Sequence, residues 1–215
     1  MNSDKIVIMD WGGVIESHKG DCSGWKARTE AIIKKLAHNE NIILNSWGTF
    51  EINGEEYNIN TINDDNLIIN WIDYLIDKYN LNCTREEFIL TYDSEYEKIE
   101  FFKDIIDILY DTKKYCNIGI LSNLPKMDFK RLKRQIDLKR LDYVWLSYEI
   151  GIAKPNPKIY EVVEQTTGIN PNNILFIDDD SVNITEAAKR GWNTLCASGS
   201  DKDIIKKAID NFLGL

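Results

Sequence analysis

The amino-acid sequence predicts an α/β fold, a doubly wound parallel sheet with a mainly helical insertion after the first strand. Five short apolar runs indicate the strands. Most of them are continuous rather than alternating, as expected where both faces of a parallel sheet are buried. They are KIVIMD, NIGILSN, YVWLSYE, NILFIDDD and WNTLCAS, at residues 5–10, 117–123, 143–149, 173–180 and 192–198. Amphipathic segments alternate with the later runs, which is typical of strands wound by helices.

Apolar spacing and terminal glycines mark the helices between the later strands. These helices are DFKRLKRQI, PKIYEVVEQTTG and ITEAAKRG, at residues 128–136, 157–168 and 184–191. The second and third end in Gly168 and Gly191, and glycine is common just past a helix C-terminus. The basic cluster KRLKRQIDLKR, residues 130–140, predicts a solvated helix face, with steering of anions as the alternative.

The long gap between the first two runs predicts a second structural unit. We expect residues 1–16 and 97–215 to form a Rossmann-like core and residues 17–96 to form the insertion. Within the insertion, LIINWIDYLIDKYNL places apolar side chains along one helical face. The tryptophans of this region are expected to pack in its core rather than to bind substrate: Trp25, Trp47 and Trp71.

Three short motifs predict local structure inside and after the insertion. TREE, residues 84–87, is a capping box that opens a helix. SEYE, residues 94–97, is expected to open the next helix, which leads back to the sheet. Asn53-Gly54 is a β-hairpin signal, with a surface loop as the alternative.

Composition and charge restrict the partners. The 215 residues carry 35 acidic and 26 basic side chains, a net charge of -9, which disfavours nucleic acid and anionic membranes as partners. An anionic substrate therefore needs a locally positive site or a bound cation. The cysteines are scattered without a CxxC pair, so we expect free thiols in a reducing compartment: Cys22, Cys83, Cys116 and Cys196. The first apolar run is too short for a signal peptide and no run could span a membrane, so we expect a cytoplasmic protein.

Polar side chains collect where the predicted strands end. The first strand ends in Asp10, the second in Ser122-Asn123 and the fourth in the triplet Asp178-Asp179-Asp180, and Lys154 follows the third. Open α/β sheets bind ligands beyond the carboxyl ends of their strands, so we expect these groups to meet there.

This combination suits phosphoryl transfer. An aspartate can attack phosphorus to form an aspartyl-phosphate, which water then hydrolyses. Mg²⁺ favours a site with one or two carboxylates and a phosphate, where it screens their mutual repulsion. Lys154, the Ser122 hydroxyl and a backbone N–H near Asn123 would hold phosphate oxygens.

Four motifs in this order resemble the haloacid-dehalogenase (HAD) superfamily of aspartate-nucleophile hydrolases, over essentially the whole chain. They are DWGGV, LSN, GIAKPNPKIY and FIDDDSVNITEAAKRGW. The helical insertion is similar to the family's C1 cap, a mobile lid. The best resemblance is to the sugar-phosphate phosphatase branch that includes α-glucose-1-phosphate phosphatase, which implies a small phosphorylated metabolite as substrate.

The resemblance implies a role for each matching residue. Asp10 is the nucleophile and a Mg²⁺ ligand. The Gly12 carbonyl and the Asp179 carboxylate complete the protein ligands, with Asp178 acting through a water molecule. Ser122 and Lys154 bind phosphate. Among the neighbouring residues, Asp180 is expected to cap a helix and Asn183 to brace the loop.

The sequence departs from the family pattern at Gly12, where relatives usually carry an aspartate that acts as general acid and base. That group is worth about 10²–10⁴-fold in rate, so we expect slow turnover or a demand for good leaving groups. Glu16 and His18 are candidates for its role, with an ordinary loop side chain as the alternative for each. Trp11 directly follows the nucleophile and is expected to face the pocket.

Two other functions stay open on the sequence alone. A metal-independent 2-haloacid dehalogenase would also lack the second aspartate, but it would not need the Asp178-Asp179 pair. A catalytically weak binding or regulatory protein could keep the fold after losing its acid, since function resides in the site rather than in the fold.

Overall fold

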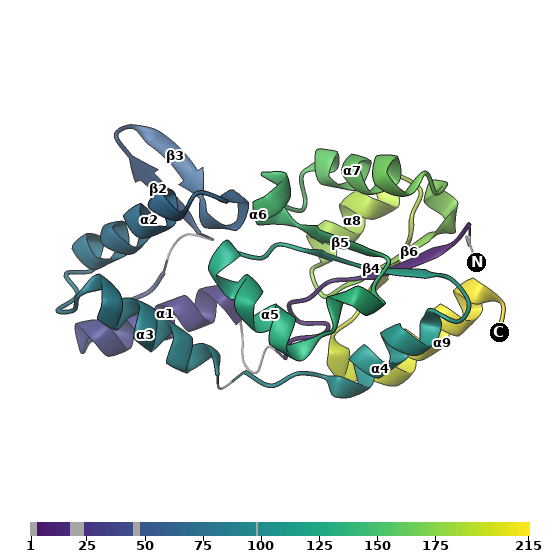
Figure 1. Ribbon diagram of the computed structural model, residues 1–215, viewed down its shortest axis with the longest axis horizontal. Coiled ribbons are helices and arrows are strands. Elements are labelled where there is room, and N and C mark those ends of the chain that lie inside the picture. Colours follow the sequence, from purple (N-terminus) through teal and green to yellow (C-terminus); the bar gives the residue numbers. More distant parts are fainter. Residues whose placement is uncertain (1–3, 18–23, 45–47, 98) are drawn as a thin grey trace.

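A computed structural model describes residues 4–17, 24–44, 48–97 and 99–215 (Figure 1). Its centre is a five-stranded sheet in the order β5-β4-β1-β6-β7, and every pair of neighbours is parallel. The strands lie within the five apolar runs: β1 (Ile6–Met9), β4 (Asn117–Ser122), β5 (Tyr143–Leu146), β6 (Ile174–Asp178) and β7 (Asn193–Cys196). The predicted fold class is therefore confirmed.

Helices cover both faces of this sheet. On one face, Val7 and Met9 pack in a cluster with side chains of α4 (Lys103–Thr112), α5 (Phe129–Gln135) and α9 (Lys202–Leu213). On the other face, Ile6 and Ile8 pack with α7 (Pro157–Thr167) and α8 (Ser181–Lys189). All four β1 side chains are fully buried, because successive strand residues point to opposite covered faces. This burial is why the run is continuously apolar.

The part of the chain between β1 and α4, which we call the segment between β1 and β4, has a hydrophobic cluster of its own, to the left of the sheet in Figure 1. Its elements are α1 (Gly24–Ala37), β2 (Thr49–Ile52), β3 (Glu55–Asn58), the short 3-10 helix η1 (Ile59–Thr61), α2 (Asp65–Lys78) and α3 (Arg85–Tyr96). Trp71 is buried in this cluster and meets Phe88 and Tyr92 edge to face, as predicted. The Trp25 side chain and Trp47 lie outside the described residues.

Local motifs decide two features of this segment. Strands β2 and β3 form an antiparallel hairpin around Asn53 and Gly54, whose φ angles of 53° and 83° suit a two-residue turn. Thr84 and Glu87 form the predicted capping box at the start of α3. The hairpin reading of Asn53-Gly54 is thus confirmed over the loop reading.

The prediction that SEYE opens a new helix is wrong. Ser94 lies in the last turns of α3, where its hydroxyl donates to the Thr91 carbonyl at 2.9 Å. Ser94 thus bonds back within the helix that Thr84 caps, as a mid-helix serine can, and this helix continues through Tyr96, while α4 begins only at Lys103. Residues 99–102 instead return to the core outside any helix, with Phe101 in an isolated β-bridge to Glu16.

The two connections between this segment and the sheet lie side by side. The Ser17 N–H donates to the Glu100 carbonyl at 2.8 Å, and the Phe102 N–H donates to the Ile15 carbonyl at 2.9 Å. The outgoing and returning chains are therefore held together at one junction. The site described below lies next to it.

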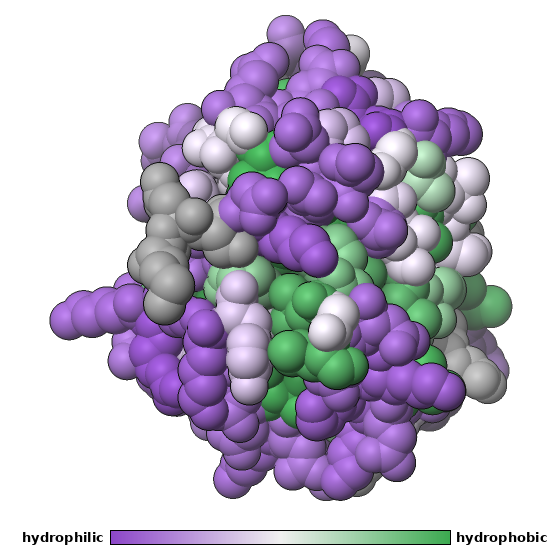
Figure 2. Space-filling model, turned by 90° about the vertical axis from the view of Figure 1, so that its right-hand side faces the viewer, coloured by the Kyte–Doolittle hydropathy of each residue, from purple (hydrophilic) through white to green (hydrophobic). Residues whose placement is uncertain are grey.

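The opposite end of the molecule carries both termini (Figure 1). Figure 2 shows this face to be mostly hydrophilic, with apolar side chains gathered near its middle. It faces the amino ends of the strands, away from the polar residues that end them. Across the part of the chain that the structure describes, no helix combines the length and apolar character needed to cross a membrane.

Candidate active site

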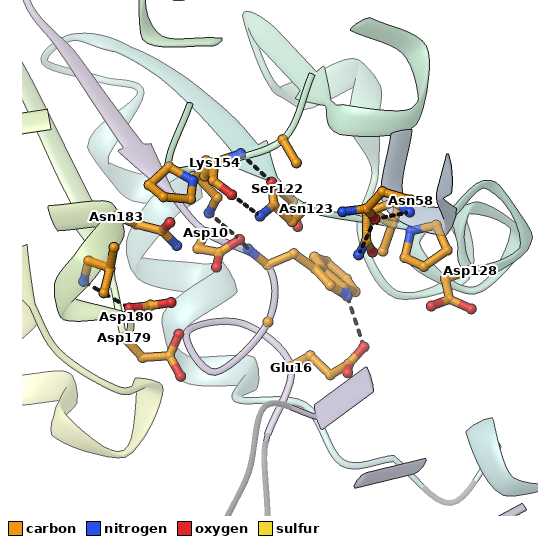
Figure 3. A pocket seen from close by; sticks show the side chains of 18 of the residues that line it. Asp10, Glu16, Asn58, Ser122, Asn123, Asp128, Lys154, Asp179, Asp180 and Asn183 are labelled. Atoms are coloured by element: carbon orange, nitrogen blue, oxygen red, sulfur yellow. Dashed lines mark hydrogen bonds and ion pairs between the residues drawn. The ribbon is translucent and has the colours of Figure 1, made fainter. Parts of the chain in front are cut away.

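A cavity of about 710 Å³ lies at the carboxyl ends of the strands. Of the described residues that were predicted to act there, its walls include all except the buried Asp178. The sheet side contributes Asp10, Gly12, Ser122, Asn123, Lys154 and Asp179. Figure 3 shows Asp10, Ser122, Asn123 and Lys154 gathered together, with Asp179, Asp180 and Asn183 to one side of them. Strand ends distant in the sequence therefore meet as the parallel sheet predicts.

Asp10 directly follows β1 and is 8% exposed. Its backbone N–H continues the sheet pairing by donating to the Ile177 carbonyl at 2.9 Å. Its carboxylate Oδ1 accepts from the Trp11 N–H at 2.6 Å and lies 3.0 Å from Lys154 Nζ. The carboxylate is thus fixed by the backbone and by one cation.

Lys154 is a cation of the site whose side chain is completely buried. Its ammonium also contacts Asp178 Oδ2 at 2.6 Å, so it bridges two carboxylates. Burial opposes the charge on Lys154, but Asp10 and Asp178 together hold its pKa above the usual value. The Asn123 amide fixes the Lys154 backbone: Nδ2 donates to the Lys154 carbonyl at 2.8 Å, and Oδ1 accepts from the Lys154 N–H at 2.7 Å.

Three carboxylates can place an oxygen within 4.8 Å of one another: Asp10, Asp178 and Asp179. Burial, followed by the charges of Asp178 and Asp179, raises the pKa of Asp10 to about 7, although Lys154 opposes the shift. Partial burial and the neighbouring Asp178 raise the pKa of Asp179 to about 6. This crowding of acids in a buried site makes a divalent cation the natural counter-charge, and oxygen ligands suit Mg²⁺.

Asp178 differs from the other two because protein donors surround it. Besides Lys154, it accepts from the Asp180 N–H at 2.8 Å and from Asn183 Nδ2 at 3.1 and 3.2 Å. Asn183 therefore braces the loop, as predicted. Asp180 caps α8 by accepting from the Val182 N–H at 2.8 Å, also as predicted.

The two glycines after Trp11 have different tasks. Gly12 lines the pocket and brings no side chain into it. Gly13 has a φ of +72°, and a Cβ at this position would overlap the Asp179 carboxylate. Gly13 thus permits both a left-handed turn and the close approach of a predicted metal ligand.

Ser122 ends β4, is 2% exposed and lines the pocket, where a phosphate-binding hydroxyl was predicted. Two residues later the Leu124 N–H donates to Ser147 Oγ at 3.0 Å. Ser147 in turn donates to the Asn60 carbonyl at 2.5 Å. The loop after Ser122 is thereby linked to the segment between β1 and β4.

Trp11 lines the pocket, as predicted, and is 2% exposed. Its ring lies against Phe101, with centroids 5.5 Å apart. Its indole Nε1 donates to Glu16 Oε2 at 2.9 Å, and Glu16 Oε1 lies 2.6 Å from Arg28 NH1. Glu16 is therefore a buried, paired pocket residue and not an ordinary loop side chain. His18 lies outside the described residues.

The basic cluster at residues 130–140 is not simply a solvated helix face. Arg131 is buried, pairs with Asp93 and with Asp128, and lies over the Tyr92 ring. Arg134 lies 2.7 Å from Glu97. The prediction is wrong for Arg131 because α5 faces α3, whose acidic side chains the linear sequence does not place beside it. It holds for Arg134, whose side chain is 65% exposed.

Several pocket residues were missed by sequence reasoning. Arg28 comes from α1, while Asn58 and Asn60 come from the end of β3 and from η1, and Asp128 lies just before α5. Asp128 is 2% exposed and accepts from the Tyr92 hydroxyl at 3.0 Å. No motif marks these residues, because their place in the pocket depends on how the segment between β1 and β4 packs over the sheet.

Comparisons with known proteins agree with this geometry. A model of the haloacid dehalogenase-like hydrolase family matches residues 36–197. A relative, (S)-2-haloacid dehalogenase 4A of Burkholderia cepacia, is 29% identical over 47% of this chain and 45% of its own length. D-Ribitol-5-phosphate phosphatase of Bacteroides thetaiotaomicron is 36% identical over 25% of this chain and 26% of its own length. The matched stretches thus span less than half of these relatives.

Among solved structures, a HAD-family enzyme of Bacteroides thetaiotaomicron in complex with magnesium and inorganic phosphate is similar throughout. It has a TM-score of 0.70 at 20% identity, with 94% of this chain and 98% of that chain covered. This likeness shows the fold. Together with the family model, which matches three quarters of the sequence, it confirms the resemblance drawn from the four motifs. The chain belongs to the haloacid dehalogenase-like hydrolase family.

Proposed function

We propose that this protein is a Mg²⁺-dependent phosphatase that hydrolyses a small phosphomonoester, a sugar phosphate or a nucleotide, through an aspartyl-phosphate on Asp10. One observation carries the proposal. A buried aspartate lies 3.0 Å from a buried lysine and shares a small space with two further carboxylates at the carboxyl end of the sheet. The phosphatase among the relatives and the magnesium and phosphate bound by the structural neighbour support the same chemistry.

The proposed reaction has two displacements at phosphorus. An Asp10 oxygen forms a bond to phosphorus while the ester P–O bond breaks, and the departing oxygen takes a proton from solvent. Water then attacks phosphorus and returns a proton to solvent as the aspartyl P–O bond breaks, which releases inorganic phosphate and restores the Asp10 carboxylate. Lys154 and the Ser122 hydroxyl would hold phosphate oxygens in both steps.

The residues present fit a Mg²⁺ ion. Asp10 and Asp179, with the Gly12 carbonyl, would hold it, and Asp178 would act through a water molecule. When bound, the ion would screen the repulsion between the Asp10 carboxylate and the phosphate. Burial raises the pKa of Asp10 to about 7. A cation would oppose this shift and favour the charged carboxylate, which is the form that attacks phosphorus.

Gly12 sets the expected limit on rate. No side chain at this position can protonate the departing oxygen, and Glu16 already accepts from Trp11 and pairs with Arg28. We therefore expect esters with good leaving groups to react fastest.

We further propose that residues 17–96 act as a cap over a core of residues 1–16 and 97–215. The separate hydrophobic cluster of this segment supports the division, as does the single junction at residues 15–17 and 100–102. Arg28, Asn58 and Asn60 would then form the roof of the pocket and contact the leaving group.

The dehalogenase alternative has a relative in its favour, the Burkholderia cepacia enzyme. That reaction would also use Asp10 as nucleophile, but it would leave three crowded carboxylates without a metal ion to offset their charge. The third possibility is a catalytically weak protein that binds a ligand at this site without hydrolysing it.

The test is a substrate panel assayed for phosphate release and for chloride release from 2-chloropropionate. Each assay is run with Mg²⁺ and with EDTA, using the wild type and Asp10→Asn. The proposal expects phosphate release that needs Mg²⁺ and disappears in Asp10→Asn. Chloride release in EDTA would establish the dehalogenase, and no turnover at high enzyme concentration would favour the binding protein.

A further inference from the structure

We propose that Glu16 is a positioning residue that couples the segment between β1 and β4 to the nucleophile loop, through Arg28 on one side and Trp11 on the other. The role rests on the proposed phosphatase function. It differs from the general acid role that the absence of an aspartate at position 12 suggests for a nearby carboxylate.

The contacts form one continuous chain from that segment to the nucleophile. Arg28 NH1, from α1, lies 2.6 Å from Glu16 Oε1. Glu16 Oε2 accepts from Trp11 Nε1 at 2.9 Å, and the Trp11 N–H donates to Asp10 Oδ1 at 2.6 Å. Every link is a direct contact between charged or polar atoms.

Burial makes these contacts consequential. Glu16 is 3% exposed and Trp11 is 2% exposed, so neither can exchange its partner for bulk water without a rearrangement. A carboxylate in such a place needs its cation, and the guanidinium of Arg28 is also largely buried, with 16% of its side chain exposed. The position of α1 over the nucleophile loop therefore depends on the ion pair between Arg28 and Glu16.

The position of Glu16 at the junction explains how movement would reach the site. Glu16 forms an isolated antiparallel β-bridge with Phe101, which lies on the chain that returns to the sheet. The Trp11 ring packs against the same Phe101. Displacing α1 would remove Arg28 from Glu16 and release the indole. The residue next to the nucleophile would then lose its anchor, so the loop would be fully ordered only when the segment is closed.

The same contacts argue against a general acid. An acid must aim an O–H at the departing oxygen of the substrate. Each oxygen of Glu16 already has a donor, Oε1 from Arg28 and Oε2 from Trp11. The carboxyl group is oriented by these donors and holds the loop in place.

Leaving-group dependence separates the two roles. Glu16→Gln, Arg28→Met and the double variant are compared with the wild type on p-nitrophenyl phosphate, which needs no proton on its leaving group, and on glycerol phosphate, which does. Positioning predicts that Glu16→Gln lowers kcat about tenfold on both esters alike, a loss typical of one charged hydrogen bond. Arg28→Met should act similarly, and the double variant should lose little more than either single variant.

The chain offers a matched control. Glu164 of α7 forms the same kind of triad, with Arg190 NH2 at 2.6 Å and Trp192 Nε1 at 2.9 Å, and none of the three lines the pocket. Glu164→Gln removes equivalent interactions away from the pocket. It should lower thermal stability and leave kcat unchanged on both esters.

A second measurement does not depend on turnover. The indole N–H resonance of Trp11, assigned from Trp11→Phe, should shift and exchange faster with solvent in Arg28→Met, because Arg28 pairs with the carboxylate that accepts from the indole. In Glu164→Gln the resonance of Trp192 should change and that of Trp11 should not.

Three results would overturn the role. A loss in Glu16→Gln confined to glycerol phosphate would make Glu16 the general acid. Unchanged kcat in Glu16→Gln would show that Glu16 has no part in the mechanism. A Trp11 resonance that does not change in Arg28→Met would show the same. If the wild type itself hydrolyses no phosphoester, the proposed function fails, and the resonance measurement still decides whether α1 is coupled to the nucleophile loop.

Discussion

Gly13 and the Asp179 carboxylate lie so close together that a Cβ added at position 13 would be 1.9 Å from Asp179 Oδ2. A Cβ on Gly13 would overlap the Asp179 carboxyl group, and the Gly13 backbone has a φ of +72°. The turn after the nucleophile and the acidic loop after β6 are therefore packed against each other at the proposed metal site. The second glycine after Asp10 is explained by this contact.

Gly13→Ala should displace Asp179 and weaken Mg²⁺ binding by about 10–100-fold, the range typical when support for a metal ligand is lost. Mg²⁺ titrations followed by calorimetry and by phosphatase activity would measure the change. Gly168→Ala is the matched control, because Gly168 has a φ of +65° with no atom within 4 Å of an added Cβ. It should cost about 1–2 kcal/mol of stability, as left-handed alanine does, and leave Mg²⁺ affinity unchanged.

Asn123→Ala should lower kcat/KM by about 10–100-fold, because the Asn123 side chain positions Lys154. Its amide holds both polar groups of the Lys154 backbone, at 2.8 and 2.7 Å, and each lost partner costs about 1–3 kcal/mol. Asn123→Asp keeps an acceptor for the Lys154 N–H but cannot donate to the carbonyl, so it should be impaired as well. Steady-state kinetics of both variants would check this, and wild-type kinetics in either would contradict it.

Mg²⁺ should stabilise the protein more at pH 8 than at pH 5.5. Burial raises the pKa of Asp10 to about 7, and burial with Asp178 raises that of Asp179 to about 6. Because these folded-state pKa values lie above the unfolded ones, the metal-free protein loses stability as pH rises from about 4 through 7. Mg²⁺ binds the deprotonated carboxylates, so its stabilisation grows over the same range.

Thermal unfolding with and without Mg²⁺, at both pH values, measures this difference. In Asp10→Asn the metal-free protein should be less sensitive to pH between 6 and 8. A shift in Tm on adding Mg²⁺ that is equal at the two pH values would contradict the prediction.

Arg131→Ala should destabilise the protein by about 3–5 kcal/mol, since it leaves Asp128 as a buried charge without its cation. The Arg131 side chain is 10% exposed and that of Asp128 is 3% exposed, with NH1 and Oδ1 3.1 Å apart. Arg134→Ala is the control on the same helix, because its pair with Glu97 is largely exposed and worth at most about 1 kcal/mol. Urea unfolding of both variants gives the comparison, and equal losses would show that the buried network is not what stabilises this contact.

Local sequence patterns predict much of the fold. The four residues of β1 are all buried on covered faces, so they had to be apolar, and a continuous run of this kind is visible without any structure. Thr84 with Glu87 and Asn53 with Gly54 act on neighbours within a few residues. Their capping box and hairpin could therefore be predicted from the sequence.

The sheet half of the site was predictable for a related reason. Asp10 and Asp179 each follow a strand directly and Ser122 is the last residue of one, and parallel strands bring such residues to one edge whatever the details of packing. Lys154 could be placed with them by its position after the third predicted strand. Its contacts with Asp10 and Asp178 follow from that topology.

The tertiary structure alone decided the rest. Ser94 carries a capping signal that α3 overrides by continuing through it, and Arg131 became a buried partner of Asp93 and Asp128. Asn58, Asn60 and Arg28 reach the pocket only because the segment between β1 and β4 packs over the sheet. Contacts of this kind depend on the relative placement of two independently packed clusters, and local sequence patterns do not encode that placement.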